Sequence, residues 1–364
     1  YIPNPVSLLE ISDQTTKERF LATPFVEIKP INELTLKASF GIDRNYQRRE
    51  VYMPKTTLYG EKADGRADIG QYDRSDYLLE LTANYAKRLG DHNLNALVGY
   101  SFQRFTSKYL NAGNQGFLTD AFLFNNLGAG TYEKPWVGSS ASKSEMASFF
   151  GRVNYTYKDR YLVTATLRAD GASNFAKNNR WGYFPSFSGA WRISEEEFME
   201  STHDWLSSLK IRASWGMLGN QDALNKSNPW ENQYYPWMQT YNLDGNYPIG
   251  GNLTTGYYQK AYRIEDLSWE KSTTWGIGLD AVINHVTFTF DYYDRKTTDI
   301  IMEVPVPTEF GLDPYFDNVG SMRNRGVEVQ LGYNNKWNDW SLNVMGNMAY
   351  NTVSYTHLRA HETP

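Results

Sequence analysis

The sequence predicts an all-β fold: a transmembrane antiparallel β-barrel, of which this chain supplies about twelve strands. Three observations support this prediction: long stretches of alternating polar and apolar residues, a polar chain that is rich in aromatics, and connections that are alternately short and long. Strands in soluble sheets average about five or six residues, whereas a tilted strand that crosses a bilayer needs about 9–11. The alternation here lasts long enough for a bilayer.

The pattern is clearest at residues 149–157 and 161–169, which flank a tight turn at 158–159. In the second stretch, one face is apolar and the other is polar. The apolar face holds Tyr161, Val163, Ala165, Leu167 and Ala169, and the polar face holds Thr164, Thr166, Arg168 and Asp170. This period of two predicts strands with one greasy and one wet face.

The same pattern recurs along the chain. The predicted strands are residues 21–28, 34–42, 77–85, 94–102, 149–157, 161–169, 185–193, 209–217, 275–283, 286–292, 327–333 and 340–350. The first 19 residues, and residues 53–72, 111–143, 173–183, 219–267 and 304–325, are predicted loops. Short periplasmic turns on one side and long extracellular loops on the other are typical of outer-membrane barrels. Aromatic residues near the strand ends, such as Tyr85, Tyr155, Tyr292 and Trp340, suit the aromatic girdles that such barrels carry at the membrane interfaces.

One connector on the short side is predicted to be helical. Ser194 and Glu197 have the spacing of a capping box, and carboxylates in a first turn suit the helix dipole. We therefore expect a short helix over residues 195–206.

The composition supports the barrel and excludes other classes. Aromatics make up 15% of the chain, with 27 Tyr and 11 Trp, yet the mean hydropathy is negative. A barrel with a polar interior has this balance because half of each strand faces water. The net charge of -5 offers no basic patch for nucleic acid, and the absence of cysteine excludes disulfides and thiolate metal sites.

Several ordered blocks of sequence resemble the SusC/RagA family, the TonB-dependent outer-membrane transporters of Bacteroidota. Residues 167–175 and 179–186 resemble its R-x-D-G-S-S-x-F and N-R-W-G-x-F-P-S motifs. The other blocks are residues 190–198, 209–216 with 219–220, 267–271 and 318–328. The chain departs from the common pattern at Ala172, usually Ser, and at Trp215, often Tyr. The resemblance covers roughly residues 21–353.

The resemblance implies TonB-dependent import of oligosaccharides or peptides across the outer membrane of a Bacteroidota-like Gram-negative bacterium. It implies a SusD-like surface lipoprotein as partner, contact with outer-membrane lipid, and energy from the TonB-ExbB-ExbD complex. Family members carry a signal peptide, a TonB-contacting segment, an N-terminal plug and about 22 barrel strands. The resemblance implies that the energy coupling acts through N-terminal parts, which we expect to lie outside this chain.

The domain prediction follows from that comparison. Residues 1–353 are expected to be a partial receptor barrel without the plug and without the first and last strands. Residues 354–364 abandon the alternation, and we expect them to be a sequencing artefact or a disordered tail. A partial barrel leaves two open sheet edges, so it should be unstable alone in a bilayer.

Two groups of residues are candidates for contacts. The first lies in the longest loop, where exposed aromatics can stack on sugars, pack against a partner or form the loop's own core: Trp230, Tyr234, Tyr235, Trp237 and Tyr241. The second group lies on the polar side of the strands, which we expect to face the lumen. Its first expected role is a solvated wall that contacts the plug, and its second is contact with substrate: Arg152, Arg168, Asp170, Lys210, Arg212 and Asp280. Gly276 and Gly278 lie on the same side and leave room there.

No convergent acid, base or nucleophile set is visible, and no histidines have metal-ligand spacing. We therefore expect no enzyme, no cofactor and no metal site. Two alternatives to the lidded importer stay open. One is a siderophore- or cobalamin-type TonB-dependent receptor, which would lack a lipoprotein gene. The other is a soluble glycan-binding β-protein, which would appear in a soluble fraction.

Overall fold

The computed structural model describes residues 4–221, 235, 237–238, 241–259 and 262–356, and most of them are in β-strands. The strands are β1 (Ser12–Ala22), β2 (Phe25–Ile31), β3 (Leu34–Met53), β4 (Arg66–Leu89), β5 (His92–Gln115), β6 (Trp136–Tyr157), β7 (Tyr161–Ala172), β8 (Trp181–Arg192), β9 (Leu206–Asn220), β10 (Tyr241–Ile249), β11 (Asn252–Gln259), β12 (Glu270–Ile283), β13 (Val286–Val304), β14 (Tyr315–Trp337) and β15 (Trp340–Thr356). The helices are short: α1 (Leu58–Glu61) and the 3-10 turns η1 (Ser7–Glu10), η2 (Leu127–Ala129), η3 (Ile193–Glu195), η4 (Glu197–Thr202) and η6 (Thr308–Phe310).

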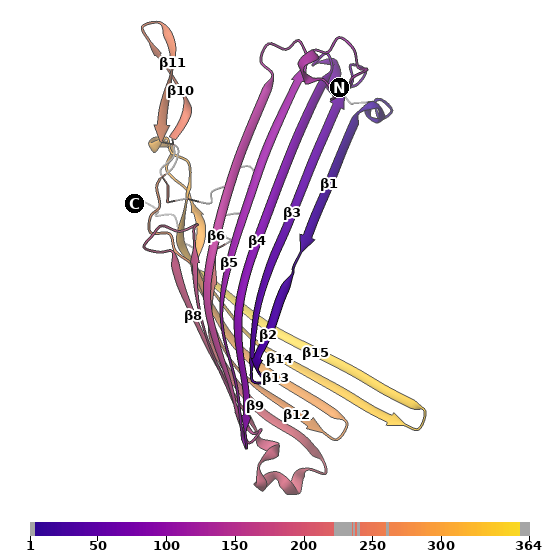
Figure 1. Cartoon of the computed structure of the whole chain (residues 1–364), viewed down its shortest axis with the longest axis vertical. Helices are drawn as coiled ribbons and strands as arrows, with labels where there is room; N and C mark the ends of the chain where they lie inside the picture. Colours follow the sequence, from indigo (N-terminus) through magenta and orange to yellow (C-terminus); the bar gives the residue numbers. More distant parts are fainter. Residues whose placement is uncertain (1–3, 222–234, 236, 239–240, 260–261, 357–364) are drawn as a thin grey trace. The chain divides into compact units, whose positions relative to one another are not determined.

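The large sheet follows chain order (Figure 1). Its strands are hydrogen-bonded in the sequence β1, β3, β4, β5, β6, β7, β8, β9, β12, β13, β14, β15, and β2 also pairs with β3. Since β1 and β2 both pair with β3, they form one interrupted edge strand, and the described sheet is twelve strands wide as the sequence predicts. Within the described residues β1 pairs only with β3 and β15 only with β14, so the sheet does not close into a barrel. Strands β10 and β11 form a separate hairpin.

The chain divides into two compact units. The first comprises Tyr1–Val26, Ser39–Leu79 and Phe102–Glu145, and the second comprises Glu27–Ala38, Glu80–Ser101 and Met146–Pro364. Strands β2 to β6 contribute residues to both units.

The first unit has a small core beneath its loops. Tyr52, Ala67, Phe117 and Phe124 are buried together, and Tyr52 lies edge-on to Phe117 with ring centroids 5.7 Å apart. The Tyr52 hydroxyl donates a hydrogen bond to Asp120 Oδ1 at 2.5 Å. This core fixes the loop after β5 against the end of β3.

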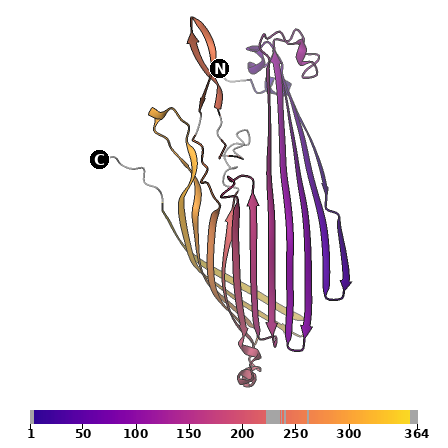
Figure 2. The same ribbon diagram turned by 60° about the vertical axis from the view of Figure 1, so that its left-hand side comes forward.

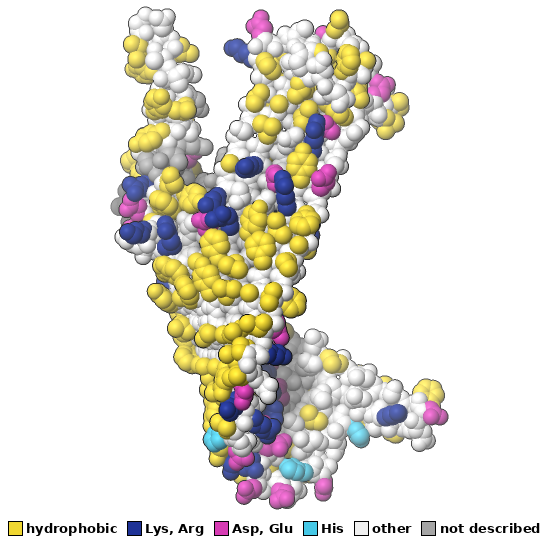
Figure 3. Space-filling view, viewed as in Figure 1, with side chains coloured by type: hydrophobic (Ala, Val, Ile, Leu, Met, Phe, Trp, Pro, Cys, Tyr) yellow, Lys and Arg dark blue, Asp and Glu magenta, His cyan; other side chains and the backbone are white. Residues whose placement is uncertain are grey.

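The second unit has one apolar and one polar face. Residues opposite each other in an antiparallel pair lie on the same face, and the register pairs Phe149 with Ala169 but Ser148 with Asp170. Hydrophobic side chains are exposed to solvent on the apolar face, and Figure 3 shows such side chains gathered over the strands. They include Val153, Tyr155, Val163, Leu167, Phe187, Trp191, Ile211, Trp215, Trp275, Ile277, Leu331 and Val344. A soluble monomer rarely exposes so large an apolar surface, whereas a lipid-facing wall requires it.

The short turns have the backbone that tight hairpins need. Lys158 and Asp159 join β6 to β7 with φ of 52° and 54°, and Asn284 and Asn338 have φ of 49° and 48° in the β12–β13 and β14–β15 turns. Positive φ at these positions matches the right-handed twist of the flanking strands. No helix among the described residues is long and apolar enough to cross a bilayer.

Several strands are longer than predicted, so parts of the predicted loops are wrong. Residues 66–72, 111–115, 136–143 and 315–325 lie in strands, and residues 12–19 form most of β1. Charged pairs hold these extensions: Arg66 contacts Asp68 at 2.8 Å and Arg44 contacts Asp73 at 2.8 Å. Because both faces of such segments are polar, they show no apolar alternation in the sequence. The predicted loop 219–267 also contains the β10–β11 hairpin.

The predicted connector helix is also wrong. Residues 193–195 and 197–202 form two 3-10 turns, separated by Glu196 in an extended conformation, and no side chain caps either turn. The Glu196 carboxylate is held by side chains from β7 and β8, which breaks the helix at this position. Ser194 is buried, and its carbonyl oxygen is bonded by the His203 ring. Figure 2 shows the connector at the ends of β8 and β9.

Candidate functional site on the polar face

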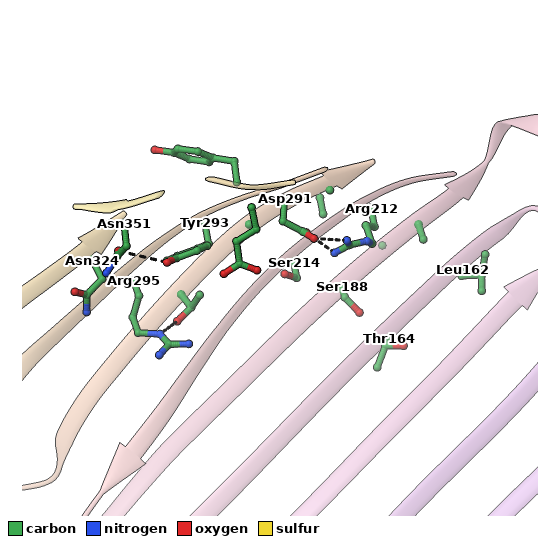
Figure 4. A pocket seen from close by; sticks show the side chains of 18 residues that line it. Leu162, Thr164, Ser188, Arg212, Ser214, Asp291, Tyr293, Arg295, Asn324 and Asn351 are labelled. Carbon is green, nitrogen blue, oxygen red and sulfur yellow. Dashed lines mark hydrogen bonds and ion pairs between the residues drawn. The ribbon is translucent and has the colours of Figure 1, made fainter. Parts of the chain in front are cut away.

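The polar face of the second unit is hollowed by a recess of about 790 Å3. Small residues of β8, β9 and β12 form its floor, among them Ser188, Ala190, Ser214, Gly276 and Gly278. Polar and charged side chains of β9, β13, β14 and β15 surround it (Figure 4): Arg212, Asp291, Tyr293, Arg295, Asn324, Glu328 and Asn351. The strand register brings these residues to one face because each lies opposite a polar or small partner.

Arg212 ties three strands together across this recess. Its guanidinium contacts Asp291 of β13 through Nη1 and Nη2, both at 2.7 Å, and donates from Nε to Asp280 of β12 at 3.1 Å. Lys210 reaches the same Asp280 at 2.9 Å. A Cβ on Gly278 would lie 2.5 Å from the Arg212 Cζ, so the missing side chain is what lets the guanidinium cross β12.

A second charged group lies nearer the loops. Arg168 donates from Nε to both oxygens of Asp170, at 2.7 and 2.8 Å, and from Nη2 to Ser148 at 3.0 Å. Its guanidinium also lies 5.6 Å from the centre of the Phe150 ring. Asp170 is nearly buried, so this pair is a fixed part of the wall. Arg152 lies on the same face by register and is exposed.

The rim of the recess offers groups of every polar kind. The Tyr293 hydroxyl donates to Asn351 at 3.3 Å, and Arg295 donates from Nε to Thr274 at 3.2 Å. Glu328 is exposed, and the described part of the chain gives it no hydrogen bond. Carboxylate, guanidinium, amide and hydroxyl groups side by side suit a polar ligand or a polar protein surface. Within the described residues, no three His, Asp or Glu side chains converge as metal ligands would.

The structure thus brings Lys210, Arg212 and Asp280 together, and Arg168 with Asp170, as parts of one polar face. Tyr235, Trp237 and Tyr241, the described aromatics among those predicted in the longest loop, are not part of this group. Trp230 and Tyr234 lie outside the described residues. Tyr235 and Trp237 pack edge-on with centroids 6.0 Å apart, and Tyr241 is 61% exposed at the start of β10.

Trp237 is held at the base of the loops by two hydrogen bonds. Its indole Nε1 donates to the carbonyl of Ser173 at 3.4 Å, and its own carbonyl accepts from Arg263 Nε at 3.0 Å. For this residue, packing within the loops accounts for the position of the ring. Tyr241 stays available for contact.

Sequence reasoning missed a cluster that we call the loop platform. It comprises Ala172, Phe175, Phe184, Leu267, Trp269 and Ile301, with Met146, Met217, Ile264 and Phe316 packed against them. The Phe184 ring packs edge-on against Trp269, with ring centroids 5.5 Å apart. The Trp269 indole donates a hydrogen bond to the carbonyl of Arg180 at 3.1 Å. Most of these residues lie in or beside the motif blocks, so their aromatics and aliphatics were the signal that could have revealed it.

Two polar side chains close the loop platform. Asn318 accepts from the Ser268 amide at 2.7 Å, and its Nδ2 donates to the carbonyls of Ser268 at 3.0 Å and Asp299 at 2.6 Å. Glu270 accepts from the Ile301 amide at 2.9 Å and from Asn220 at 2.6 Å. These bonds join the ends of the loops that follow β9 and β13.

Comparison with known proteins gives one family and consistent relatives. The model of the family described as TonB dependent receptor-like, beta-barrel matches residues 27–363. TonB-dependent receptor P3 of Formosa agariphila is 31% identical over 93% of this chain and 33% of its own length. TonB-dependent receptor SusC of Bacteroides thetaiotaomicron is 31% identical over 90% of this chain and 32% of its own length. This chain therefore spans about a third of these relatives.

A solved structure of the RagAB peptide transporter has a similar fold. It superimposes with a TM-score of 0.83 at 27% identity, covering 97% of this chain and 38% of that one. The resemblance to the SusC/RagA family inferred from the motif blocks is confirmed by these matches.

Proposed function

The chain belongs to the TonB-dependent receptor β-barrel family, whose members lie in the outer membrane, and we propose that it forms part of the wall of an importer for oligosaccharides or peptides. The observation that carries the proposal is the sheet with two different faces. Its exposed apolar face suits lipid, and its polar face, with the recess around Arg212, suits a wet lumen.

The proposed substrates follow from the relatives. RagAB is described as a peptide importer, and SusC as a TonB-dependent receptor. The recess offers hydrogen-bond donors and acceptors and charged groups of both signs, which suits hydroxyl-rich or zwitterionic ligands. We propose that Arg152, Arg168, Asp170, Lys210, Arg212 and Asp280 form the wetted wall, against the plug first and passing substrate second.

The proposed partners are a SusD-like surface lipoprotein on the side of the long loops and the TonB-ExbB-ExbD complex. The longest loop supports the first, since Tyr241 and Tyr257 of the β10–β11 hairpin are 61% and 74% exposed. Exposed tyrosines are enriched where proteins bind each other. We propose that Trp230, Tyr234, Tyr235, Trp237 and Tyr241 contribute to substrate or partner contacts from this loop. Catalysis has no part in the proposal.

Uptake measurements test this function. The complete gene that contains this chain, and its neighbouring genes, would be recovered by long-read sequencing and expressed in a host that lacks its own importer. We expect uptake of labelled oligosaccharides or peptides that needs both the lipoprotein gene and the proton-motive force. Uptake of a ferric siderophore without any lipoprotein would favour the siderophore receptor. A gene product found in the soluble fraction would overturn the importer.

A further inference from the structure

A cluster of positive charge lies on the apolar face near the middle of β13 and β14, on the long-loop side of the apolar stretch of these strands. Arg323 contacts Asp294 through Nη2 at 2.6 Å, and Arg325 contacts the same carboxylate through Nε at 3.0 Å. The Asp294 side chain is 4% exposed, whereas those of Arg323 and Arg325 are 45% and 50% exposed. One buried carboxylate therefore aligns two guanidinium groups side by side at the surface.

A third cation joins them through the strand register. Lys296 lies directly opposite Arg323, so its side chain is on the same face. It is exposed, and the described residues give it no carboxylate partner. The cluster thus holds three cations against one carboxylate. The hydroxyl residues Thr352 and Ser354 lie opposite Arg325 and Arg323 on β15. Residues 354–356 therefore continue the strand, so the predicted disordered tail does not begin at residue 354.

The cluster begins where the apolar face ends. Asp294 pairs with both Trp275 and Arg325, and the next residues down on the same face are Tyr292, Ile277 and Val327. Below them the face continues through Phe290, Val329 and Leu331, whereas above them it becomes charged. The rings of Trp275 and Tyr292 pack at this border with centroids 5.3 Å apart. Trp and Tyr are enriched at membrane–water interfaces. The border is on the side of the long loops.

We propose that Arg323, Arg325 and Lys296 bind the phosphate of an anionic lipid in the leaflet on the side of the long loops. The cluster carries two positive charges more than its one carboxylate balances, and such an excess at the lipid border suits an anionic headgroup. Because the cluster borders the lipid-facing surface, a phosphate held there would lay its acyl chains over Ile277 and Leu331. A soluble phosphate would gain nothing from that surface.

Lipid binding to the complete gene product in detergent tests this proposal. Native mass spectrometry would count bound phosphatidylglycerol against phosphatidylcholine. Lys296→Gln and Arg325→Gln should each weaken phosphatidylglycerol binding about five-fold. Lys296→Gln is the decisive variant, because it breaks no ion pair of the described residues.

Arg295→Gln is the matched control, because Arg295 neighbours Lys296 on the opposite face of β13. It removes one charge and should leave lipid binding unchanged. An equal loss in Arg295→Gln, or no loss in Lys296→Gln, would overturn the proposal. Inorganic phosphate that binds as tightly as the lipid would overturn it too, by making the cluster a site for soluble anions.

Discussion

At the scale of single residues, ion pairs between neighbouring strands hold the polar face together. Arg212 of β9 reaches over β12 to Asp291 of β13 while also contacting Asp280. This reach is possible only because Gly278 lies beneath the guanidinium. From the sequence, Gly278 was predicted to lie on the polar side of its strand and to leave space there. In the structure, the guanidinium of Arg212 occupies that space.

A side chain at residue 278 should therefore disturb this network. We expect Gly278→Ala to lower the free energy of unfolding by about 1–3 kcal/mol, because the new methyl group displaces the guanidinium from its carboxylates. The measurement is the urea midpoint followed by heat-modifiable gel mobility of the complete gene product. Gly346→Ala is the control, since a Cβ there meets nothing within 4 Å. Equal midpoints for both variants would refute the role of Gly278.

Glu196 predicts a pH dependence in the connector between β8 and β9. Its carboxylate accepts from the Tyr161 hydroxyl at 2.6 Å, the Trp191 indole at 2.9 Å and Arg160 at 3.1 Å. The bond from Tyr161, followed by that from Trp191, holds the pKa of Glu196 below its ordinary value. A lowered folded-state pKa stabilises the fold above the unfolded-state value, and this contribution is lost as pH falls through the folded-state pKa.

We therefore expect the connector to loosen only in acid, below a pH of about 4.3, the ordinary value for Glu. Hydrogen exchange of residues 193–205, read against pH, would show this loss of protection. Glu196→Gln should flatten the pH dependence of exchange in this segment. A connector that exchanges equally at pH 7 and pH 3 would contradict the assignment.

At the scale of elements, the loop platform decides where the long loops begin. Asn318 at the start of β14 bonds both Ser268 and Asp299, so it joins the loop before β12 to the end of β13. The buried rings of Phe175, Phe184 and Trp269 fill the space beneath. The loop with the β10–β11 hairpin therefore returns to the sheet at a fixed point.

Removing the Asn318 side-chain amide should free the end of the loop before β12 from β13 and β14. Asn318→Ala removes three hydrogen bonds, to the Ser268 amide and to the carbonyls of Ser268 and Asp299, and each such bond contributes about 0.5–1.5 kcal/mol. We expect faster proteolysis within residues 221–269 and unchanged proteolysis in the short turns. Asn178→Ala, an exposed change in the loop between β7 and β8, is the control. If the two variants were cut at the same rate, Asn318 would not hold the loop.

The strands and the connector show which parts of the fold could be predicted from the sequence. The membrane-spanning part of the strands was predictable because Tyr161 to Ala169 or Trp340 to Tyr350 alternates over a length that a bilayer imposes. The extensions were not, because Arg66, Asp68 and Arg74 stabilise strands with two polar faces. The prediction of the connector helix failed because Glu196 bonds to Tyr161 and Arg160, which are distant in sequence. That Arg212 and Asp280 share the polar face was predictable from the period of two, but their contacts depend on the register of β9 with β12.

At the scale of the whole molecule, the two faces of the sheet and its two edges matter most. β1 has only β3 as a partner and β15 only β14 within the described residues, so each presents a row of unpaired backbone groups. In water such groups bond to solvent. In a bilayer core each unsatisfied group costs several kcal/mol, and only a closed sheet avoids this.

The last prediction concerns the 364 residues expressed by themselves. We expect them to bind membranes through the apolar face without forming a stable inserted barrel, because the edges of β1 and β15 stay open. The complete gene product, refolded in the same lipid vesicles, should show heat-modifiable gel mobility and protection from protease, and the isolated chain should show neither. An isolated chain that inserts with both properties would mean that its edges are satisfied in some other way, and it would refute the argument from unpaired backbone.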